Sequence, residues 1–590
     1  MTATDPRTGS PGQWNWGPMA EATRALAERA ASELGPEADL FGDDQDAAGF
    51  GAAVTHVLRS TAKRPLATTR AALRFADALT RVPLATTARW MGGDVEGPVP
   101  LDPKDLRFAD PAWDANPLFH GIRLSYLASC RFVRDVVGAA DVDAGTAGEA
   151  ALATELMLDA VAPTNFLATN PAALKLAFDT SGVSLAKGAR NFVDDVRHNQ
   201  GRPRQVDTRS FEVGRNLAAT PCKVVYRNDL MELLQYEPQT PDVHANPLLC
   251  SPPWINKYYV MDLAPGRSFI EWAVQHGRTV FAMSYRNATK EMAHVTMGDY
   301  LVQGPVAAMD VIQEITGAET IDIVGLCLGG ALTAITDAYL RQSGDDRIGT
   351  LTLLNTMLDY SDPGQLGIFT DRRTVEKLER TMQREGVLEG SSMAGTFDML
   401  RANNLIFNYV VSNWLMGQDP PAFDILAWNA DSTRMPAAMH AFYLRNFYVD
   451  NKLAAGTLEI AGTTIDLSAI KSPSYVVSAI NDHIVPWASS YKTTRLVNGP
   501  VRFVLSSGGH IAGIVNPPGP KAWYQVSASD DVPPSSATAW RDAAERRGGS
   551  WWADWTQWSD ENSGLMQAPP SMGSDRHPAL GDGPGIYVRT

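Results

Sequence analysis

The sequence is poor in cysteine and has no long apolar run. Four cysteines occur among 590 residues, with no CxxC pair and no spacing typical of metal ligands. We therefore expect neither a disulfide framework nor a zinc site, and the natural compartment is a reducing cytoplasm. No apolar run approaches the roughly 20 residues of a membrane-spanning helix. The first residues lack the charged and apolar regions of a secretory signal, so we expect none.

An excess of positive charge is also absent. The chain has 51 Lys and Arg against 66 Asp and Glu, a formal net charge of −15. Because recognition of nucleic-acid phosphates needs a basic surface, a nucleic-acid-binding role is disfavoured. A hydrophobic content of 44% and a charged content of 20% fit an ordinary globular protein. The length allows more than one hydrophobic core.

Hydrophobic periodicity divides the chain into three parts. Residues 1–48 hold one Ala-rich helical pattern among Gly, Pro and Asp, and we expect a mobile head. Residues 49–210 keep apolar residues at three- and four-residue intervals, which predicts an all-helical N-terminal domain. In residues 211–590 β-rich runs alternate with helical ones, which predicts a parallel sheet covered on both faces. The expected strands are 231–236, 247–250, 279–285, 321–325, 351–355, 474–478 and 501–505, and helices between them include 300–315 and 328–340.

Two stretches of the third part depart from this alternation. Residues 359–471 are mostly helical and rich in aromatic residues, and they are too long for a loop. We expect an inserted cap over the C-terminal edge of the sheet. The tail contains four tryptophans, of which Trp551, Trp555 and Trp558 would share one helix face. We favour core packing for them over a surface that contacts polymer or membrane.

One stretch has the form of a nucleophile elbow. Residues 321–332, IDIVGLCLGGAL, run from an apolar strand through Gly325-x-Cys327-x-Gly329 into a helix. In such an elbow the nucleophile lies in a strained turn, and small residues on either side let strand and helix pass closely. The helix N-terminus favours the Cys327 thiolate, and the Leu328 N–H would be an oxyanion donor. We favour this interpretation over a Cys327 that is only a buried small side chain.

A cysteine nucleophile needs a base, and this fold places an acid and then a histidine downstream. His510 follows a predicted strand and a Gly-Gly pair, where the fold carries its base. Asp482 lies at the end of another strand and would orient the His510 imidazole. The neighbouring His483 is a rival base, but adjacent residues at a strand end usually point apart. The histidines beyond Cys327 are His440, His483, His510 and His577.

A second oxyanion donor is expected from the loop after the third strand. The candidate loop is 250–259, CSPPWINKYY, and within it we propose the Ile255 N–H. Pro252 and Pro253 have no N–H and are excluded. The alternative is that the loop is a plain turn.

Taken together, these motifs give the chain from about residue 110 to 588 a clear family resemblance. It resembles the polyhydroxyalkanoate synthases, particularly the single-subunit type that takes short-chain substrates. The matching stretches are 211–221 (FEVGRNLAATP), 252–259 (PPWINKYY), 284–287 (SYRN), 325–330 (GLCLGG), 426–431 (LAWNAD), 481–487 (NDHIVPW), 509–513 (GHIAG) and 549–552 (GSWW).

The resemblance implies an α/β-hydrolase fold with a helical cap, preceded by the all-helical N-terminal domain. It implies a triad of Cys327, Asp482 and His510 that polymerises (R)-3-hydroxyacyl-CoA into a polyester and releases CoA. No cofactor or metal is expected beyond the CoA thioester substrate. The resemblance further implies a homodimer at the surface of cytoplasmic storage granules, where phasin-type coat proteins are possible partners.

The residues themselves fit acyl transfer. A thiolate that attacks a CoA thioester forms a second thioester of similar energy, which keeps the acyl group activated. The hydroxyl of a 3-hydroxyacyl unit could then attack, with His510 or Asp482 as its base. A Cys-dependent thioesterase or lactone hydrolase would share the triad and differ in accepting water. A non-catalytic granule-coat protein, with the Trp-rich tail as its adhesive, is an alternative of another class.

Overall fold

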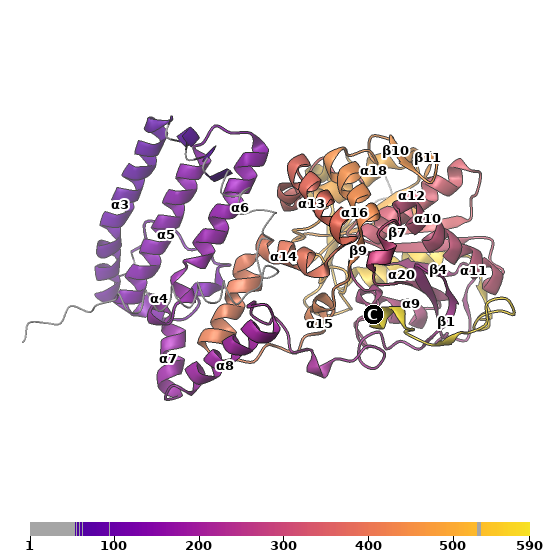
Figure 1. Cartoon of the computed structure of the whole chain (residues 1–590), viewed down its shortest axis with the longest axis horizontal. Helices are drawn as coiled ribbons and strands as arrows, with labels where there is room; N and C mark the ends of the chain where they lie inside the picture. The colour runs from indigo at the N-terminus through magenta and orange to yellow at the C-terminus, as the bar shows by residue number, and fades with distance from the viewer. Residues whose placement is uncertain (1–52, 55, 58, 62, 94, 528–532) are drawn as a thin grey trace, which may run out of the picture. The chain divides into compact units, whose positions relative to one another are not determined.

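The computed structural model describes residues 53–590 except 55, 58, 62, 94 and 528–532 (Figure 1). The expected head at 1–48 lies outside the described residues. The chain forms two compact units, which are treated separately below. The first runs to Arg204 and includes Arg401–Pro420, and the second comprises Gln205–Leu400 and Pro421–Thr590.

In the first unit the helices α3 (Pro65–Trp90), α5 (Pro117–Gly138) and α6 (Ala144–Ala160) lie side by side (Figure 1). α7 (Pro171–Asp179) and α8 (Val183–His198) follow. Asn-Pro pairs begin α5 and α7, because the Asn side chain accepts a backbone N–H and proline is suited to the first helical position. Between residues 53 and 204 the described part of the chain is helical and contains no strand.

The first unit also takes up a segment from the middle of the predicted insertion. The π-helical stretches η9 (Asn403–Phe407) and η10 (Val410–Leu415) belong to it, and η10 packs on α8. The indole N–H of Trp414 donates to Asp195 Oδ2 at 2.8 Å. A Cβ at Gly188 would lie 1.9 Å from the Trp414 carbonyl oxygen, so only glycine allows this approach. The insertion therefore contributes to both units.

The second unit is built on an eleven-stranded sheet with the order β15-β14-β13-β12-β7-β6-β4-β5-β2-β1-β17. Each predicted strand is present, and the centre of the sheet, from β5 to β13, is parallel. Neighbouring residues Ile323 and Val324 of β6 belong to different apolar clusters, so both faces of the sheet are covered. The central strands are β4 (Leu248–Ser251), β5 (Val280–Tyr285), β6 (Ile321–Leu326), β7 (Ile348–Leu354), β12 (Ser474–Ala479) and β13 (Val501–Ser506).

The sheet is parallel at its centre, as predicted, and antiparallel at both edges. On one side β2 (Met231–Tyr236), β1 (Cys222–Arg227) and β17 (Gly581–Asp582) pair antiparallel. On the other side β14 (Trp523–Val526) and β15 (Glu545–Gly548) do the same. β14 and β15 are four residues long and β15 is polar, so these two strands carry little of the apolar signal that marks a central strand.

The helix predicted over 300–315 is interrupted. α10 (Met297–Leu301) passes into a π-helical turn, η7 (Val302–Val306), before α11 (Ala307–Thr316). Gly304 has φ −92° and ψ −108°, outside the helical region, and Pro305 follows it. Since proline has no N–H and its ring clashes with the preceding turn, a helix breaks at such a pair.

The tryptophans of the tail pack into the core, as the sequence analysis favoured. They lie on α20 (Trp551–Asn562). The side chain of Ser550, the residue before this helix, accepts the Trp552 N–H and caps its N-terminus. Trp551, Trp552 and Trp555 are fully buried. The Trp555 indole donates to Thr352 Oγ1 of β7 at 2.9 Å, which ties the helix to the centre of the sheet.

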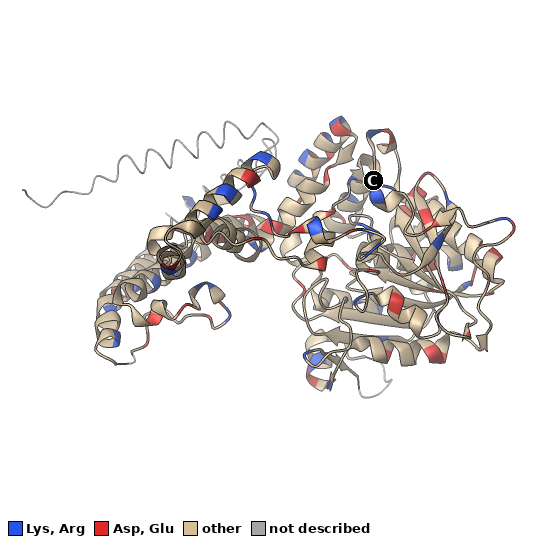
Figure 2. Cartoon of the chain, turned by 90° about the horizontal axis from the view of Figure 1, so that it is seen from below, with Lys and Arg blue, Asp and Glu red and all other residues tan. Residues whose placement is uncertain are grey.

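Charged residues of both signs are mixed along the helices of each unit (Figure 2). Many form exposed ion pairs, such as Arg134 with Glu155 at 2.6 Å. Such pairs contribute at most about 1 kcal/mol each to stability. Within the described ranges, no helix combines the length and the apolar character that a membrane crossing requires.

The insertion carries a buried histidine whose titration is coupled to folding. His440, on α16 (Ala437–Tyr443), is 1% exposed, and burial lowers its pKa to about 4. The unfolded chain takes up this proton near pH 6.5, whereas the folded chain does so only near pH 4. The free energy of unfolding therefore decreases as the pH falls from 6.5 to about 4, and His440 accounts for about 3 kcal/mol of this decrease.

We expect His440→Phe to flatten the pH dependence of stability between pH 7 and 4.5. The measurement is the denaturation midpoint of both proteins across this range. An unchanged slope in the variant would contradict the assignment.

Candidate active site

Cys327 lies in the sharp turn between β6 and α12 (Leu328–Gln342), with φ +53° and ψ −113°. A positive φ is costly for a residue with a Cβ and persists only when the surroundings enforce it. Here the Cys327 N–H donates to Leu354 O of β7 at 2.8 Å. Its carbonyl accepts the Gly330 N–H at 3.0 Å, within the first turn of α12. The strand, the turn and the helix predicted around Cys327 are therefore present.

The glycines around Cys327 allow three close approaches. A Cβ at Gly325 would lie 2.5 Å from Gly330 Cα, so strand and helix could not cross as they do. A Cβ at Gly329 would lie 2.1 Å from Ser251 O, in the last residue of β4. A Cβ at Gly330 would lie 1.9 Å from Thr356 Oγ1. The Gly-x-Cys-x-Gly-Gly pattern is thus a steric requirement of this turn.

Asp482 and His510 meet at the ends of neighbouring parallel strands. Asp482 follows β12 and His510 follows β13, and the two strands pair from Ser474 with Val501 onward. His510 Nδ1 and Asp482 Oδ2 are 2.7 Å apart. The Asp482 side chain is fully buried and that of His510 is 9% exposed. The histidine that pairs with Asp482 is therefore His510.

The charges around His510 favour its protonated form. Burial by itself lowers the pKa of His510, but the Asp482 carboxylate and the Cys327 sulfur outweigh it and raise the pKa well above its usual range. Hydrogen bonds to Asp482 and to Cys327 act in the same direction. His510 thus interacts with the Cys327 sulfur on one side and with the Asp482 carboxylate on the other. A cysteine beside such an imidazole can act as a nucleophile with an adjacent acid and base.

The loop that carries His510 is held by residues that the sequence did not reveal as part of the site. The Asn355 side-chain amide donates to the His510 carbonyl oxygen. Asn355 directly follows β7, has φ +43° and is fully buried. The indoles of Trp551 and Trp552 donate to Gly513 O and Ile514 O, each at 2.9 Å. An Asn with positive φ after a buried strand has no local sequence signature, whereas the Trp-Trp pair was visible as a motif.

The predicted oxyanion donors lie on two segments that touch. Leu328 is the first residue of α12, and the first N–H groups of a helix have no partner within it. The loop after β4 reaches this helix, because Ser251 Oγ donates to Gly329 O at 3.3 Å. Ile255 lies in the turn that ends this loop, beside Trp254. The roles of the Leu328 and Ile255 N–H groups remain predictions.

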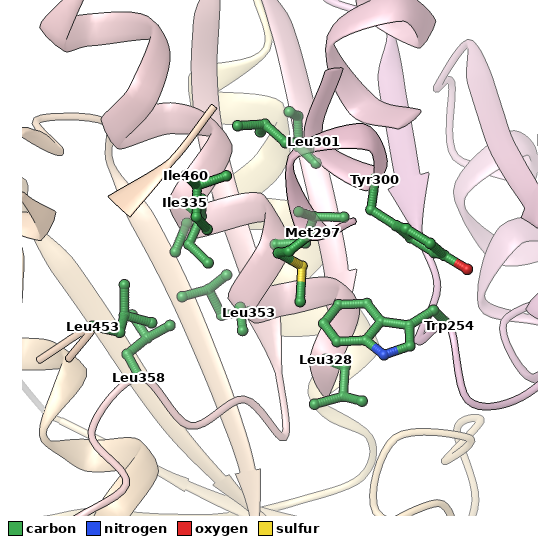
Figure 3. Close-up of a cluster of buried hydrophobic side chains, with 14 of the residues drawn as sticks. Trp254, Met297, Tyr300, Leu301, Leu328, Ile335, Leu353, Leu358, Leu453 and Ile460 are labelled. Atoms are coloured by element: carbon green, nitrogen blue, oxygen red, sulfur yellow. The ribbon is translucent and has the colours of Figure 1, made fainter. Parts of the chain in front are cut away.

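Aromatic side chains lie near Cys327. Tyr360, Tyr443 and Tyr448 contact one another, with ring centroids 4.9 to 6.2 Å apart. Burial raises the pKa of all three phenols, and the nearby Cys327 raises it further. Trp254 lies edge-on to Tyr443 at 5.6 Å, and it shares an apolar cluster with Leu328 (Figure 3). Two of these tyrosines come from α16 and η11 (Leu444–Val449), so the insertion reaches the surroundings of the nucleophile.

In the part of the chain that the structure describes, no group of three or more His, Cys, Asp or Glu is placed to hold a metal ion. The reactive groups assembled at this site are a thiol, an imidazole and a carboxylate, which are groups that nucleophilic acyl transfer uses. That no cofactor is required remains an expectation.

Comparison with known proteins gives two family models and several close relatives. The model "Poly-beta-hydroxybutyrate polymerase (PhaC) N-terminus" matches residues 104–273, and the α/β-hydrolase fold model matches residues 252–517. The latter confirms the predicted fold class. A poly(3-hydroxyalkanoate) polymerase subunit PhaC of Rhizobium meliloti is 41% identical over 85% of this chain and 82% of its own length.

Two further relatives match over a similar extent. A poly(3-hydroxyalkanoate) polymerase of Methylorubrum extorquens is 38% identical over 91% of this chain and 89% of its own length. A poly(3-hydroxyalkanoate) polymerase subunit PhaC of Cupriavidus necator is 39% identical over 84% of this chain and 85% of its own length. The similarity thus spans most of both chains in each comparison.

Asp482→Asn is expected to lower the pKa of His510, because the carboxylate charge that offsets the effect of burial on this pKa is removed. A neutral imidazole favours the thiolate of a neighbouring cysteine less than an imidazolium does. Alkylation of Cys327 by iodoacetamide should therefore slow about tenfold or more, because each unit by which the pKa of His510 falls changes its protonation equilibrium about tenfold. The rate is followed at pH 7 by mass spectrometry. The exposed Glu319→Gln is the control, and equal rates in both variants would contradict the coupling.

Gly329→Ala is expected to destabilise the second unit by about 1–3 kcal/mol, because the new Cβ meets the Ser251 carbonyl. The matched control is Gly548→Ala, where an added Cβ meets no atom within 4 Å. Thermal unfolding of the two variants tests this. A Gly329→Ala protein as stable as the control would show that the close approach is not required.

Proposed function

The chain belongs to the poly(3-hydroxyalkanoate) polymerase family, and from this premise we propose that it polymerises (R)-3-hydroxyacyl-CoA into a polyhydroxyalkanoate and releases CoA. It is an acyltransferase on an α/β-hydrolase fold. The observation that carries the catalytic assignment is the arrangement of Cys327 in its strained turn beside the 2.7 Å pair of His510 and Asp482. Cys327 is the nucleophile, His510 the acid and base, and Asp482 its orienting partner.

In the acylation step the Cys327 thiolate adds to the thioester carbonyl carbon. A C–S bond forms, and the electron pair of the C=O π bond moves to the oxygen. The N–H groups of Leu328 and Ile255 stabilise this oxyanion. When the oxyanion collapses, the bond to the CoA sulfur breaks and His510 protonates the departing thiolate. The product is an acyl thioester on Cys327, of similar energy to the substrate.

In the elongation step the 3-hydroxyl of an acyl unit attacks a thioester carbonyl. An ester C–O bond forms, the C–S bond to Cys327 breaks with the Cys327 thiolate as the leaving group, and the polymer grows by one unit. The hydroxyl proton goes to His510 or to Asp482, and the 2.7 Å contact between them allows either. Water would divert the intermediate to free acid, so the aromatic side chains of Tyr360, Tyr443 and Tyr448 serve to exclude it.

The wider setting belongs to the same proposal. We expect a homodimer that works in the cytoplasm at the surface of polyhydroxyalkanoate granules, with phasin-type coat proteins as partners. The formal charge of −15 disfavours nucleic acid as a partner. The rival function, a Cys-dependent thioesterase or lactone hydrolase, is not favoured by the family.

Incubation with (R)-3-hydroxybutyryl-CoA is expected to release CoA and to produce turbidity from insoluble polyester. CoA release with soluble free acid would overturn the polymerase function in favour of the hydrolase. Cys327→Ala should lose activity by about three orders of magnitude or more, because triad members act as a unit. Cys130→Ala, a buried cysteine of the first unit, is the control. Full activity of Cys327→Ala would instead support a non-catalytic role.

A further inference from the structure

Lys257 is a buried cation in the loop that carries Ile255. Its side chain is 8% exposed, although lysine is almost never buried without partners. Nζ lies 3.0 Å from Asp431 Oδ1 and donates to the Val588 carbonyl oxygen at 2.6 Å. Asp431 and Val588 lie far apart in the sequence, and both contact the loop through the ammonium group of Lys257.

The backbone of the same loop is held by α15 (Asp424–Ala430) and by the residues that directly follow it. The Trp428 indole donates to the Lys257 carbonyl oxygen at 2.8 Å, and Asn256 forms a β-bridge with Ser432. The Tyr259 hydroxyl donates to the second oxygen of Asp431 at 2.8 Å. Residues 256–259 are thus fixed by their backbone and by two side chains.

The partner on the other side, the C-terminal tail, is itself anchored to the sheet. The N–H groups of Ile586 and Tyr587 both donate to Glu232 Oε2 at 2.9 Å. Glu232 is a fully buried residue of β2 and is ion-paired with Arg227. The Val588 carbonyl is therefore a rigid acceptor for Lys257.

The segment between β4 and Lys257 is held in part by packing, because Trp254 is 3% exposed and lies edge-on to Tyr443. Two of its residues, Pro252 and Pro253, have no N–H to donate. At its start it is fixed where Ser251 contacts Gly329 at the beginning of α12. Its other end is fixed at Lys257, two residues after Ile255. The direction of the Ile255 N–H therefore depends on these two anchors together with the packing of Trp254 and the β-bridge of Asn256.

We propose that Lys257 is a positioning residue for the oxyanion donor of Ile255, and that through it Asp431 and the C-terminal tail support catalysis. The inference rests on the proposed function, in which Cys327 attacks a carbonyl. Lys257 does not touch the reacting atoms. It holds the loop so that the Ile255 N–H meets the oxygen on which charge develops.

The test compares two reactions of Cys327 in the full-length protein. Addition of the thiolate to butyraldehyde forms a C–S bond and an oxyanion, which takes a proton from His510 and depends on the oxyanion donors. Alkylation by iodoacetamide forms a C–S bond, expels iodide and develops no such oxyanion. Loss of a whole donor costs about 10²–10³ in rate, so a displaced donor should cost about tenfold or more.

For Lys257→Met and Asp431→Asn we expect kcat to fall at least about tenfold while KM stays within about twofold. The Kd for butyraldehyde should rise by a similar factor as kcat falls, and the alkylation rate should stay within about twofold. Lys257→Arg should restore part of kcat, because it keeps a donor and a charge. The matched control is Arg372→Met, which removes an exposed cation paired with Asp450 and should change none of these quantities.

Alkylation that slows together with kcat would overturn the proposal, since Lys257 would then support the whole site or the whole fold. Unchanged kcat in Asp431→Asn and in a chain lacking residues 588–590 would also overturn it. These two variants decide the question if Lys257→Met does not fold. The comparison of butyraldehyde with iodoacetamide does not depend on whether a hydroxyl or water receives the acyl group. A wild-type protein that yields free acid would therefore overturn the polymerase function and leave the role of Lys257 standing.

Discussion

The backbone of Cys327 is held at a positive φ by the bond from its N–H to Leu354 O and by the close passage of α12 over β6. This constraint puts the sulfur at the N-terminus of α12, where the helix dipole favours a thiolate. It also requires glycine at 325, 329 and 330, because a Cβ at each would collide with a neighbouring segment. The loop after β4 can approach the nucleophile only because Gly329 lacks a side chain.

The second constraint is electrostatic. His510 and Asp482 lie in a largely buried site, where a charge loses hydration and must be compensated by its neighbour. Asp482 and Cys327 both raise the pKa of His510, which therefore lies well above the usual range despite burial. The phenols near Cys327 keep the surroundings apolar without supplying a competing charge.

The sequence predicted the parts of the molecule that depend on local pattern. The central strands, the elbow at Cys327 and the order of Asp482 and His510 all follow from apolar runs and glycine positions that can be read along the chain. Long-range contacts left no such signal. Lys257 looks like a surface lysine, and its partners lie more than 150 residues away in the sequence. The packing of η10 on α8 likewise depends on a match between Gly188 and Trp414 that neither segment reveals alone.

The central claim is that Cys327 carries the growing acyl chain as a thioester. Mass spectrometry of the protein, quenched in acid within seconds of mixing with (R)-3-hydroxybutyryl-CoA and then digested, tests it most directly. The account predicts hydroxybutyryl units on the peptide that contains Cys327, removed by hydroxylamine as a thioester should be. Polymer formation with an unmodified Cys327 peptide, or with the acyl units on Cys130, Cys222 or Cys250, would contradict it.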